Sequence, residues 1–387
     1  MGKLKTSKVV LGNGTRIDAQ ALMSLSAVPF FARYDMKLKN IFTFENLYNA
    51  HEECRLGKQH KRGTIMFEMD AASAISKLVK ELTAQKYKIG KYREFKICDP
   101  KERMIKALAY KDRVVLMCFC KKAIQPRLEN QLIFDNAASR TNKGTLFAIK
   151  RLHKFMKALF INTGNNNAYF LKCDITKYFP SIDHEILMAQ LCKCGFSPEE
   201  LWFMTLVIKS HDENKGVPLG NQTSQWFALL YLNPIDRFIK EQLRAPYYVR
   251  YMDDFVLLHH NKEFLQRCKA AIEKACADKL KLKLNAKTRI GMIKNGVDFL
   301  GFNHKLTATG KVTKILRSSA RIRQRQYLKA VSHCYLNDIV DDEYLAQRRA
   351  AFRAHLKGTK ECKRITNKIS TLRRRKRVLG SKDTLDL

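Results

Sequence analysis

The chain of 387 residues is long enough for two or three packed subdomains, and a hydrophobic content of 45% excludes a disordered tail. Its 73 Lys and Arg face 36 Asp and Glu, and the resulting net charge of +37 predicts a polyanionic partner, nucleic acid before a membrane surface. The sequence has no apolar run of about 18 residues and no signal-peptide core, so we expect a cytoplasmic protein with no membrane partner.

The cysteines and histidines follow no metal-binding pattern. Eleven cysteines are spread along the chain, no C-x-x-C pair occurs, and the ten histidines are not placed to complete a zinc site. We therefore expect reduced thiols and no structural zinc.

Helical patterns dominate the N-terminal part of the chain. A helix is predicted over residues 42–55, and apolar residues at helical spacing predict a second one over 66–83. The segment 87–97 is typical of a strand, a turn at Gly90 and a second strand.

A cluster of cations follows in a stretch that we expect to be helical or looped. It consists of Lys101, Arg103, Lys106, Lys111 and Arg113. Such a cluster is usually a solvated face, and the alternative is a set of cations that clamps the phosphoryl oxygens of a triphosphate. The spacing leaves both interpretations open. Helices are then predicted over 114–128 and 145–160, with a polar bend between them that is either a plain loop or a phosphate contact.

An apolar strand over residues 168–175 ends in Asp174, and an acid at the end of such a strand indicates a site more than a core position. A turn with two aromatic residues follows and would wall a pocket beside the acid. Further on, a Gly-Pro-polar loop at 216–225 leads into a predicted helix over 226–243. Gly220 permits close backbone approach there, and the N–H groups at the helix start can meet a phosphate or a base.

Two β-prone runs at 247–258 flank the adjacent acids Asp253 and Asp254, which predicts a β-hairpin with both acids at its tip. Adjacent carboxylates between apolar walls repel each other and are costly to desolvate, so a divalent metal ion is the expected partner. The alternative, an ordinary Asp-Asp turn, is disfavoured by the second acid-bearing strand upstream.

The remaining elements are a helix over 262–280, a strand over 280–285 followed by Lys287, and a short strand over 297–302. Residues 305–387 hold 22 Lys and Arg against 7 acids and are predicted to be helical throughout. A basic run at 373–377 either contacts nucleic acid or belongs to a frayed tail.

The acids define the chemistry if their strands are neighbours in one sheet. Asp174 and Asp253 would then share two Mg²⁺ ions about 3.5–4 Å apart, with Mn²⁺ as a substitute. One ion would activate an attacking hydroxyl, and the other would hold the phosphates and the leaving pyrophosphate. The basic helical tail would hold a duplex through its phosphates.

These motifs in this order resemble those of a reverse transcriptase over roughly residues 87–303. YMDD at 251–254 resembles the family's metal motif, and LKCDITKYFPSIDH at 171–184 its first palm motif. The resemblance implies that Phe179 blocks a ribose 2′-OH. It also implies a set of metal ligands, namely Asp174, Asp253, Asp254 and the main-chain carbonyl of Ile175.

The resemblance extends to the other parts of the site. KERMIKALAYKDRVV resembles the finger motifs, which makes Arg103, Lys106 and Arg113 candidates for binding the nucleotide triphosphate. Lys287 matches a lysine thought to assist the departure of pyrophosphate. VDFLGF resembles the primer-grip turn, which involves Phe299, Leu300 and Gly301.

One difference from the usual motifs of the family indicates a particular subfamily. Group II intron and retron enzymes usually carry Gln-Gly-x-x-x-Ser-Pro before the long palm helix, whereas this chain has Leu219 and Gly220 and ends the motif in Ser-Gln at Gln225. This pattern resembles the reverse transcriptases of diversity-generating retroelements, which copy a template-repeat RNA with frequent errors opposite adenine. The resemblance implies template RNA, a primer or cDNA strand, dNTPs and a basic pentameric accessory variability protein as partners, in a bacterial, archaeal or phage-encoded system.

The sequence therefore predicts an α+β right-hand polymerase fold. The expected domains are an N-terminal extension with fingers at 1–165, a palm at 166–303 with a fingers insertion near 186–215, and a basic helical thumb and tail at 304–387. Two alternatives remain: a group II intron-like or abortive-infection (defence) reverse transcriptase without a mutagenic role, and a non-catalytic RNA-binding scaffold.

Overall fold

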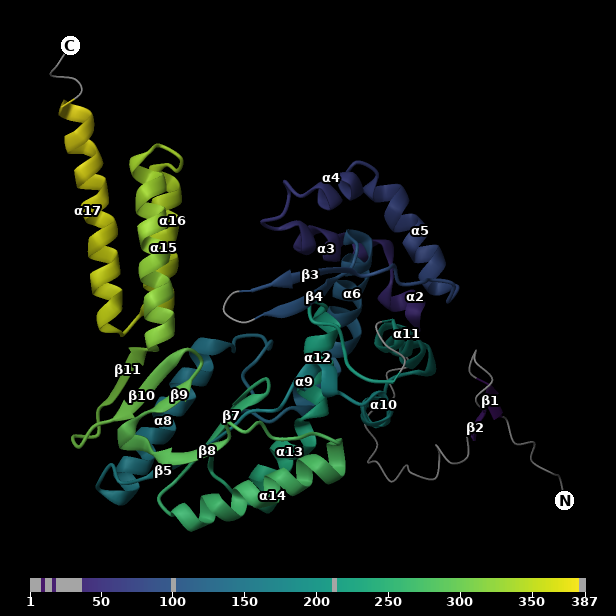
Figure 1. Cartoon of the computed structure of the whole chain (residues 1–387). Coiled ribbons are helices and arrows are strands. Elements are labelled where there is room, and N and C mark those ends of the chain that lie inside the picture. Colours follow the sequence, from purple (N-terminus) through teal and green to yellow (C-terminus); the bar gives the residue numbers. More distant parts are fainter. Residues whose placement is uncertain (1–7, 11–15, 19–36, 99–101, 211–213, 383–387) are drawn as a thin grey trace. The chain divides into compact units, whose positions relative to one another are not determined.

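A computed structural model describes residues 8–10, 16–18, 37–98, 102–210 and 214–382. Contacts divide the chain into two compact units, residues 1–128 with 184–223 (unit 1) and residues 129–183 with 224–387 (unit 2). Figure 1 labels most of the elements of both units. The division into 1–165, 166–303 and 304–387 expected from the sequence stays a prediction. Within the described ranges, no helix is long and apolar enough to cross a membrane.

Unit 1 is mostly helical and has two short hairpins. One hairpin pairs β1 (Lys8–Val10) with β2 (Arg16–Asp18), and the other pairs β3 (Arg93–Ile97) with β4 (Arg103–Ala107). Its helices are α2 (Leu38–Ile41), α3 (Phe44–Arg55), α4 (Arg62–Glu68), α5 (Ala71–Thr83), α6 (Tyr110–Phe119), α7 (Gln125–Leu128), α10 (His184–Cys192) and α11 (Pro198–Lys209). A π-helical turn over Cys120–Ile124 joins α6 to α7.

Side-chain caps mark the starts of two unit 1 helices, α3 and α11. The Thr43 hydroxyl accepts a hydrogen bond from the Asn46 amide at the start of α3. Ser197 and Glu200 form a reciprocal capping box at the start of α11. The core of the unit is aromatic, with the Phe119 and Phe203 rings 4.5 Å apart between centroids and the Phe42 ring packed on both.

Two expectations for unit 1 are wrong in detail. The helix predicted over 66–83 is two helices, because the chain breaks between α4 and α5. The first strand and the turn predicted around Gly90 are not formed, whereas the second strand is present as β3. It pairs with β4, so the cationic stretch expected to be helical or looped begins as a strand. Gly90 is needed for a close approach, since a Cβ there would lie 2.7 Å from Asp112 Oδ2.

The central sheet of unit 2 has four antiparallel strands in the order β6-β7-β5-β8. The strands are β5 (Tyr169–Cys173), β6 (Tyr247–Tyr251), β7 (Asp254–His259) and β8 (Arg289–Met292). The strand predicted over residues 168–175 is confirmed as β5. The hairpin predicted over 247–258 is confirmed as β6 and β7. The strand expected over 280–285 is reduced to a single bridge between Ile175 and Leu284.

Helices cover both faces of this sheet. On one face, α8 (Thr145–Thr163) packs Leu152, Phe155 and Met156 into a core that includes Phe170 and Val256. Against the other face lie α12 (Gln222–Tyr231), α13 (Asn233–Arg237), which a π-helical turn (Phe238–Gln242) extends, and α14 (Lys262–Leu280). The Asn261 side chain caps α14, which matches the helix predicted over 262–280. The short elements are α9 (Tyr178–Ser181) and the 3₁₀ turns Glu129–Gln131 and Ile293–Asn295.

The C-terminal part of unit 2 begins with a three-stranded antiparallel sheet in the order β11-β10-β9. Its strands are β9 (Val297–Phe299), β10 (Phe302–Leu306) and β11 (Val312–Leu316). Three helices follow, α15 (Ser318–Leu336), α16 (Asp342–Leu356) and α17 (Lys360–Lys382). The prediction of helix throughout 305–387 is therefore wrong for residues 305–316, where the chain turns back at Gly310 to complete the sheet.

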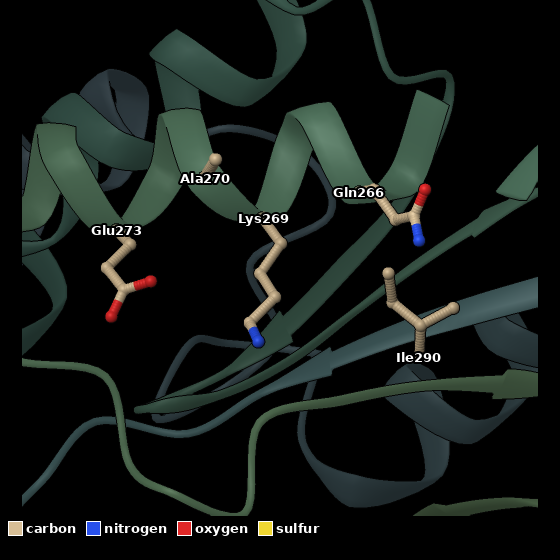
Figure 2. A pocket seen from close by; sticks show the side chains of 5 residues that line it. All are labelled: Gln266, Lys269, Ala270, Glu273 and Ile290. Atoms are coloured by element: carbon tan, nitrogen blue, oxygen red, sulfur yellow. The ribbon is translucent and has the colours of Figure 1, made fainter. Parts of the chain in front are cut away.

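A shallow groove of about 330 Å³ lies between α14 and β8 (Figure 2). Gln266, Lys269, Ala270 and Glu273 line it from the helix, and Ile290 lines it from the strand. Ile290 pairs with Leu171, whose side chain faces α14, away from the face that carries the acids described below. The groove is therefore separate from the candidate active site.

A buried histidine, His304, and its half-buried partner His153 make the stability of unit 2 sensitive to acid. His304 Nε2 donates to the carbonyl of Phe299 (3.1 Å), so its Nδ1 accepts from His153 Nε2 (2.8 Å), and both rings are neutral. Burial lowers the pKa of His304 to about 3 and that of His153 to about 4, and the cations Lys314 and Lys157 act in the same direction on His153.

The unfolded histidines take up protons near their ordinary pKa of 6.5, whereas the folded ones resist protonation until the pH is near 4. We therefore expect the free energy of unfolding to fall as the pH drops from 6.5 to 4. His304→Gln should flatten this dependence in denaturant unfolding, while His60→Gln on an exposed loop should leave it unchanged. An unchanged slope in His304→Gln would contradict the assignment.

Candidate active site

The YMDD segment forms a tight two-residue turn between β6 and β7. Tyr251 pairs with Asp254, so Met252 and Asp253 are the only residues of the turn. Met252 has a left-handed φ of 55°, which short hairpin turns require but which is unfavourable for a residue with a side chain. The adjacent acids thus lie where the apolar strands reverse direction.

The register brings Asp174 to this turn. In the pairing of β5 with β7, Cys173 lies opposite Phe255, so Asp174 lies one position beyond, opposite Asp254. Paired residues in an antiparallel sheet point to the same face, and this face also carries Phe170 and Val256 of the core packed on α8. The two carboxylates therefore lie on one face at the end of adjacent strands.

Lys172 contributes a cation to the same face. Its Nζ lies 3.3 Å from Asp254 Oδ2 and donates to the main-chain carbonyl of Asp298 at 2.5 Å. Burial raises the pKa of Asp254 to about 6, the Lys172 ammonium opposes this shift, and the carboxylates of Asp174 and Asp253 add to it. The carboxylates of Asp174 and Asp253 thus lie close enough to affect the charge of Asp254.

The donor set fits a divalent cation. The buried Oδ1 of Asp254 has no hydrogen-bond partner among the described residues, and carboxylate oxygens are the ligands that Mg²⁺ and Mn²⁺ prefer. Within those residues, no group of three or more His, Cys, Asp or Glu side chains is already gathered closely enough to hold a metal ion. The site therefore offers one oriented, unpartnered oxygen and two neighbouring carboxylates.

The segment after Asp174 is anchored from both sides. Thr176 N donates to the Lys283 carbonyl at 3.0 Å, and Asn285 N donates to the Asp174 carbonyl at 2.7 Å. The next helix is held by Tyr178, whose buried hydroxyl donates to the Ala228 carbonyl at 2.5 Å. Phe179 packs edge-on against Tyr178 and is half-buried, so part of its ring remains available at the surface.

The predicted position of Lys287 follows from the same contacts. Its amide donates to the Asn285 side chain at 3.0 Å, and Asn285 is bonded to the Asp174 main chain. Lys287 therefore follows, by two residues, the point at which the chain is hydrogen-bonded to the main chain of Asp174. Its role in pyrophosphate departure stays a prediction.

The predicted primer grip is a second tight turn. Phe299 pairs with Phe302, and the two turn residues Leu300 and Gly301 have φ values of 49° and 87°. Two consecutive left-handed residues are typical of a two-residue hairpin. Lys172 donates to the carbonyl of Asp298, which precedes Phe299 in β9, so one lysine contacts both the Asp254 carboxylate and the strand that leads into the predicted primer grip.

Three of the predicted nucleotide-binding residues lie together in unit 1. Lys106 N donates to the Leu219 carbonyl at 3.2 Å, and a Cβ on Gly220 would lie 2.9 Å from the Lys106 carbonyl. Gly220 is therefore required by close packing of the 216–221 loop on β4. Arg103 lies exposed on the same strand, and the Lys106 ammonium is paired with Glu94 at 2.8 Å.

Arg113 lies on α6, where its guanidinium packs over the Tyr110 ring at 5.4 Å. Its role as a triphosphate ligand stays a prediction. Gln225 belongs to unit 2 and is exposed, and it accepts a hydrogen bond from the Ser139 hydroxyl at 2.5 Å. The polar bend and the start of the long palm helix are thus joined through this pair.

Two contributors to the site were not anticipated. Lys172 stands two residues before Asp174, and strand alternation alone would have placed both side chains on one face. Arg250 and Asp236 form a fully buried ion pair behind the turn, both 0% exposed. In the sequence, each of them is a charged residue within an otherwise largely apolar segment, Arg250 in β6 and Asp236 in α13.

An antiparallel sheet with helices on both faces and acids at the ends of adjacent strands is the palm of an α+β right-hand polymerase fold. The family described as reverse transcriptase (RNA-dependent DNA polymerase) matches residues 96–304, more than half of the 387 residues. The chain belongs to this family, whose members are RNA-directed DNA polymerases that use divalent metal ions.

Solved structures show more distant similarity. An apo telomerase from Candida tropicalis truncated from its C-terminal domain has 15% identity and a TM-score of 0.45, covering 58% of this chain and 54% of that chain. A telomerase from Candida albicans in complex with a TWJ fragment of telomeric RNA has 12% identity and a TM-score of 0.47, covering 77% and 60%. The chain thus spans roughly half to three fifths of their lengths. A search of curated protein sequences gave no match.

Proposed function

We propose that this chain is an RNA-directed DNA polymerase that extends a primer on an RNA template. The observation that carries the proposal is the register of β5 and β7, which supports Asp174 and Asp254 acting on one face beside Asp253. Membership of the reverse transcriptase family supports the same activity.

Each predicted site residue of unit 2 has its own part in the proposed reaction. Asp174, Asp253, Asp254 and the Ile175 carbonyl would hold two Mg²⁺ ions, which supply charge neutralisation for the attacking 3′-hydroxyl and the leaving pyrophosphate. Lys172 balances the charge of Asp254 and keeps its carboxylate oriented. Phe179 would bound the sugar site, and Lys287 would meet the leaving pyrophosphate.

The nucleotide and the duplex need cations elsewhere on the chain. Arg103 and Lys106, with Arg113, would bind the triphosphate, and Leu219, Gly220 and Gln225 would border the nascent base pair. A groove of about 320 Å³ between α15 and α17 is lined by four cations and two apolar residues. These are Arg325, Lys329, Arg364 and Lys368, with Leu328 and Ile365. Phosphate contacts from such a surface supply most of the affinity for a duplex.

Primer extension tests the proposal. The chain, with a primer annealed to an RNA template, dNTPs and Mg²⁺ or Mn²⁺, should lengthen the primer. A protein that binds the duplex but extends no primer with either ion would overturn the enzymatic proposal and favour the RNA-binding scaffold.

Within the family, we propose the mutagenic role of a diversity-generating retroelement. The support is the sequence of the loop, in which Leu219 replaces the usual Gln and Gln225 replaces the usual Pro. The template would then be a template-repeat RNA, the product an adenine-mutagenised cDNA, and the partner a basic pentameric accessory variability protein. Genomic neighbours distinguish this role from an intron-encoded or defence enzyme, since only the first has a template and variable repeat pair.

The proposed cause of low fidelity is local. An amide at position 219 would hydrogen-bond near the nascent pair, whereas the half-buried Leu219 presents only methyl groups. One polar contact is worth about 1 kcal/mol, which corresponds to a change of roughly 5-fold. We therefore expect Leu219→Gln to lower misincorporation opposite template adenine about 5-fold in sequenced extension products.

Leu219→Met is the matched control for this experiment, because it keeps the size and the apolar character of the side chain. It should retain the wild-type error spectrum. Equal error rates in wild type and Leu219→Gln would show that Leu219 only packs.

A further inference from the structure

Arg250 is a buried cation on the reverse face of the palm sheet. Val249 pairs with Val256 on the face that carries the acids, so the next residue, Arg250, points to the opposite face. There its side chain meets Asp236 of α13, and both side chains are 0% exposed. Its main chain is also fixed, because Arg250 N donates to the Asp135 carbonyl at 3.1 Å and Ala137 N donates to the Arg250 carbonyl at 2.9 Å.

One guanidinium connects three elements. Its Nε and Nη2 donate to the two carboxylate oxygens of Asp236 at 2.7 Å and 2.5 Å. Nη2 also donates to the Leu229 carbonyl of α12 at 3.1 Å. Nη1 donates to the Met252 carbonyl at 2.9 Å. Tyr248 adds a hydrogen bond from its hydroxyl to Asp236 Oδ1 at 2.5 Å, which completes the partners of that carboxylate.

The bond to Met252 acts on the catalytic turn itself. Met252 has the left-handed φ of 55°, and its carbonyl belongs to the peptide plane that leads directly into Asp253. A conformation that a side chain disfavours persists only where its surroundings hold it. Arg250 stabilises this conformation through its hydrogen bond to the Met252 carbonyl. Its side chain lies on the face of the sheet opposite the acids, which no substrate reaches in the proposed reaction.

Stability alone does not account for this arrangement. A buried ion pair can often be replaced by apolar residues of similar volume without loss of stability, because desolvation offsets the attraction between the charges. The planar fork of Arg, in contrast, can satisfy a carboxylate and two carbonyls at once, which a Lys ammonium in the same place cannot reproduce.

We propose that Arg250, held by Asp236, is a positioning residue that sets the conformation of the Met252–Asp253 turn and thereby the place of the Asp253 carboxylate. This inference rests on the proposed polymerase function. Arg250 also connects α12, which carries Gln225, to the turn through its hydrogen bond to the Leu229 carbonyl. Arg250 itself touches no substrate.

The test separates charge balance from positioning. Arg250→Met leaves Asp236 buried without its partner and is expected to lower the unfolding temperature. The double variant Arg250→Met/Asp236→Leu removes both charges and should unfold at a higher temperature than Arg250→Met, while the Met252 carbonyl loses its hydrogen bond from Arg250. Arg250→Lys keeps a charge opposite Asp236 but loses the fork. Arg237→Met removes a half-exposed arginine of α13, the helix that carries Asp236, and serves as the control.

Two readouts are measured on each folded variant. Single-turnover extension at saturating dNTP should be slower by about 100-fold in the double variant, the effect of a misplacement of about 1 Å, with unchanged affinity for the primer duplex. Amide hydrogen exchange of the Met252–Asp254 segment should be faster in the double and Lys variants, and protection elsewhere in the sheet unchanged. Arg237→Met should match the wild type in both.

Wild-type rates and wild-type exchange at the turn in both the double variant and Arg250→Lys would overturn the inference. Lack of extension by the wild-type protein would instead refute the proposed function, and the exchange experiment would still decide whether Arg250 holds the turn. Slower extension with faster exchange confined to the turn supports the positioning role.

Discussion

Asp253→Asn is expected to lower primer extension by roughly 10³-fold or more, since metal coordination supplies several kcal/mol of charge stabilisation in the transition state. An amide keeps the size of the side chain but presents a neutral oxygen to the metal ions. The turn itself should persist, because Met252 and its hydrogen bond from Arg250 are untouched. The measurement is single-turnover extension of a primer on an RNA template with Mg²⁺.

Asp278→Asn provides the matched control for this experiment. Asp278 is exposed on α14, which packs on the opposite face of the sheet from Asp174. This control should extend primers at the wild-type rate, and both variants should bind the primer duplex with wild-type affinity. Extension by Asp253→Asn at a rate near that of the control would remove Asp253 from the catalytic set.

Phe179→Val should relax the discrimination between deoxynucleotides and ribonucleotides by about 10- to 100-fold, which corresponds to the 1–3 kcal/mol typical of a steric clash. The Tyr178 hydroxyl anchors this turn in the core and thereby fixes the backbone that carries Phe179, whose ring would bound the sugar site in the proposed function. The smaller side chain would leave room for a 2′-OH. The measurement is kcat/KM for dNTP and rNTP on the same template.

Phe179→Tyr keeps the ring and should retain the discrimination of the wild type. Phe179→Val should also extend with dNTPs at nearly the wild-type rate, because the acids are unchanged. An unaltered dNTP to rNTP ratio in Phe179→Val would show that the ring does not bound the sugar site.

The two units differ in how closely sequence patterns predicted them. In unit 2, the apolar alternation of β5, β6 and β7 and the capped helix α14 were predictable, because each depends on neighbours in sequence. In unit 1, the sequence predicts a turn at Gly90, but this residue permits a close approach to Asp112, which is distant in sequence. Residues 305–316 were predicted as helix, yet they add β10 and β11 to β9. β11 pairs with β10, and its β-branched residues Val312, Thr313 and Ile315 favour a strand locally as well.

The sequence by itself determined the acids and their order, because Asp174 ends an apolar strand and Asp253 and Asp254 interrupt a hairpin. It also determined that the chain would carry the basic surface that a polyanion requires. Only the tertiary structure decided which acids share a face, because that depends on the register between strands from distant parts of the chain. The same holds for Lys172 and for the Arg250–Asp236 pair, since a buried charge is recognisable only when its partner is brought to it by folding.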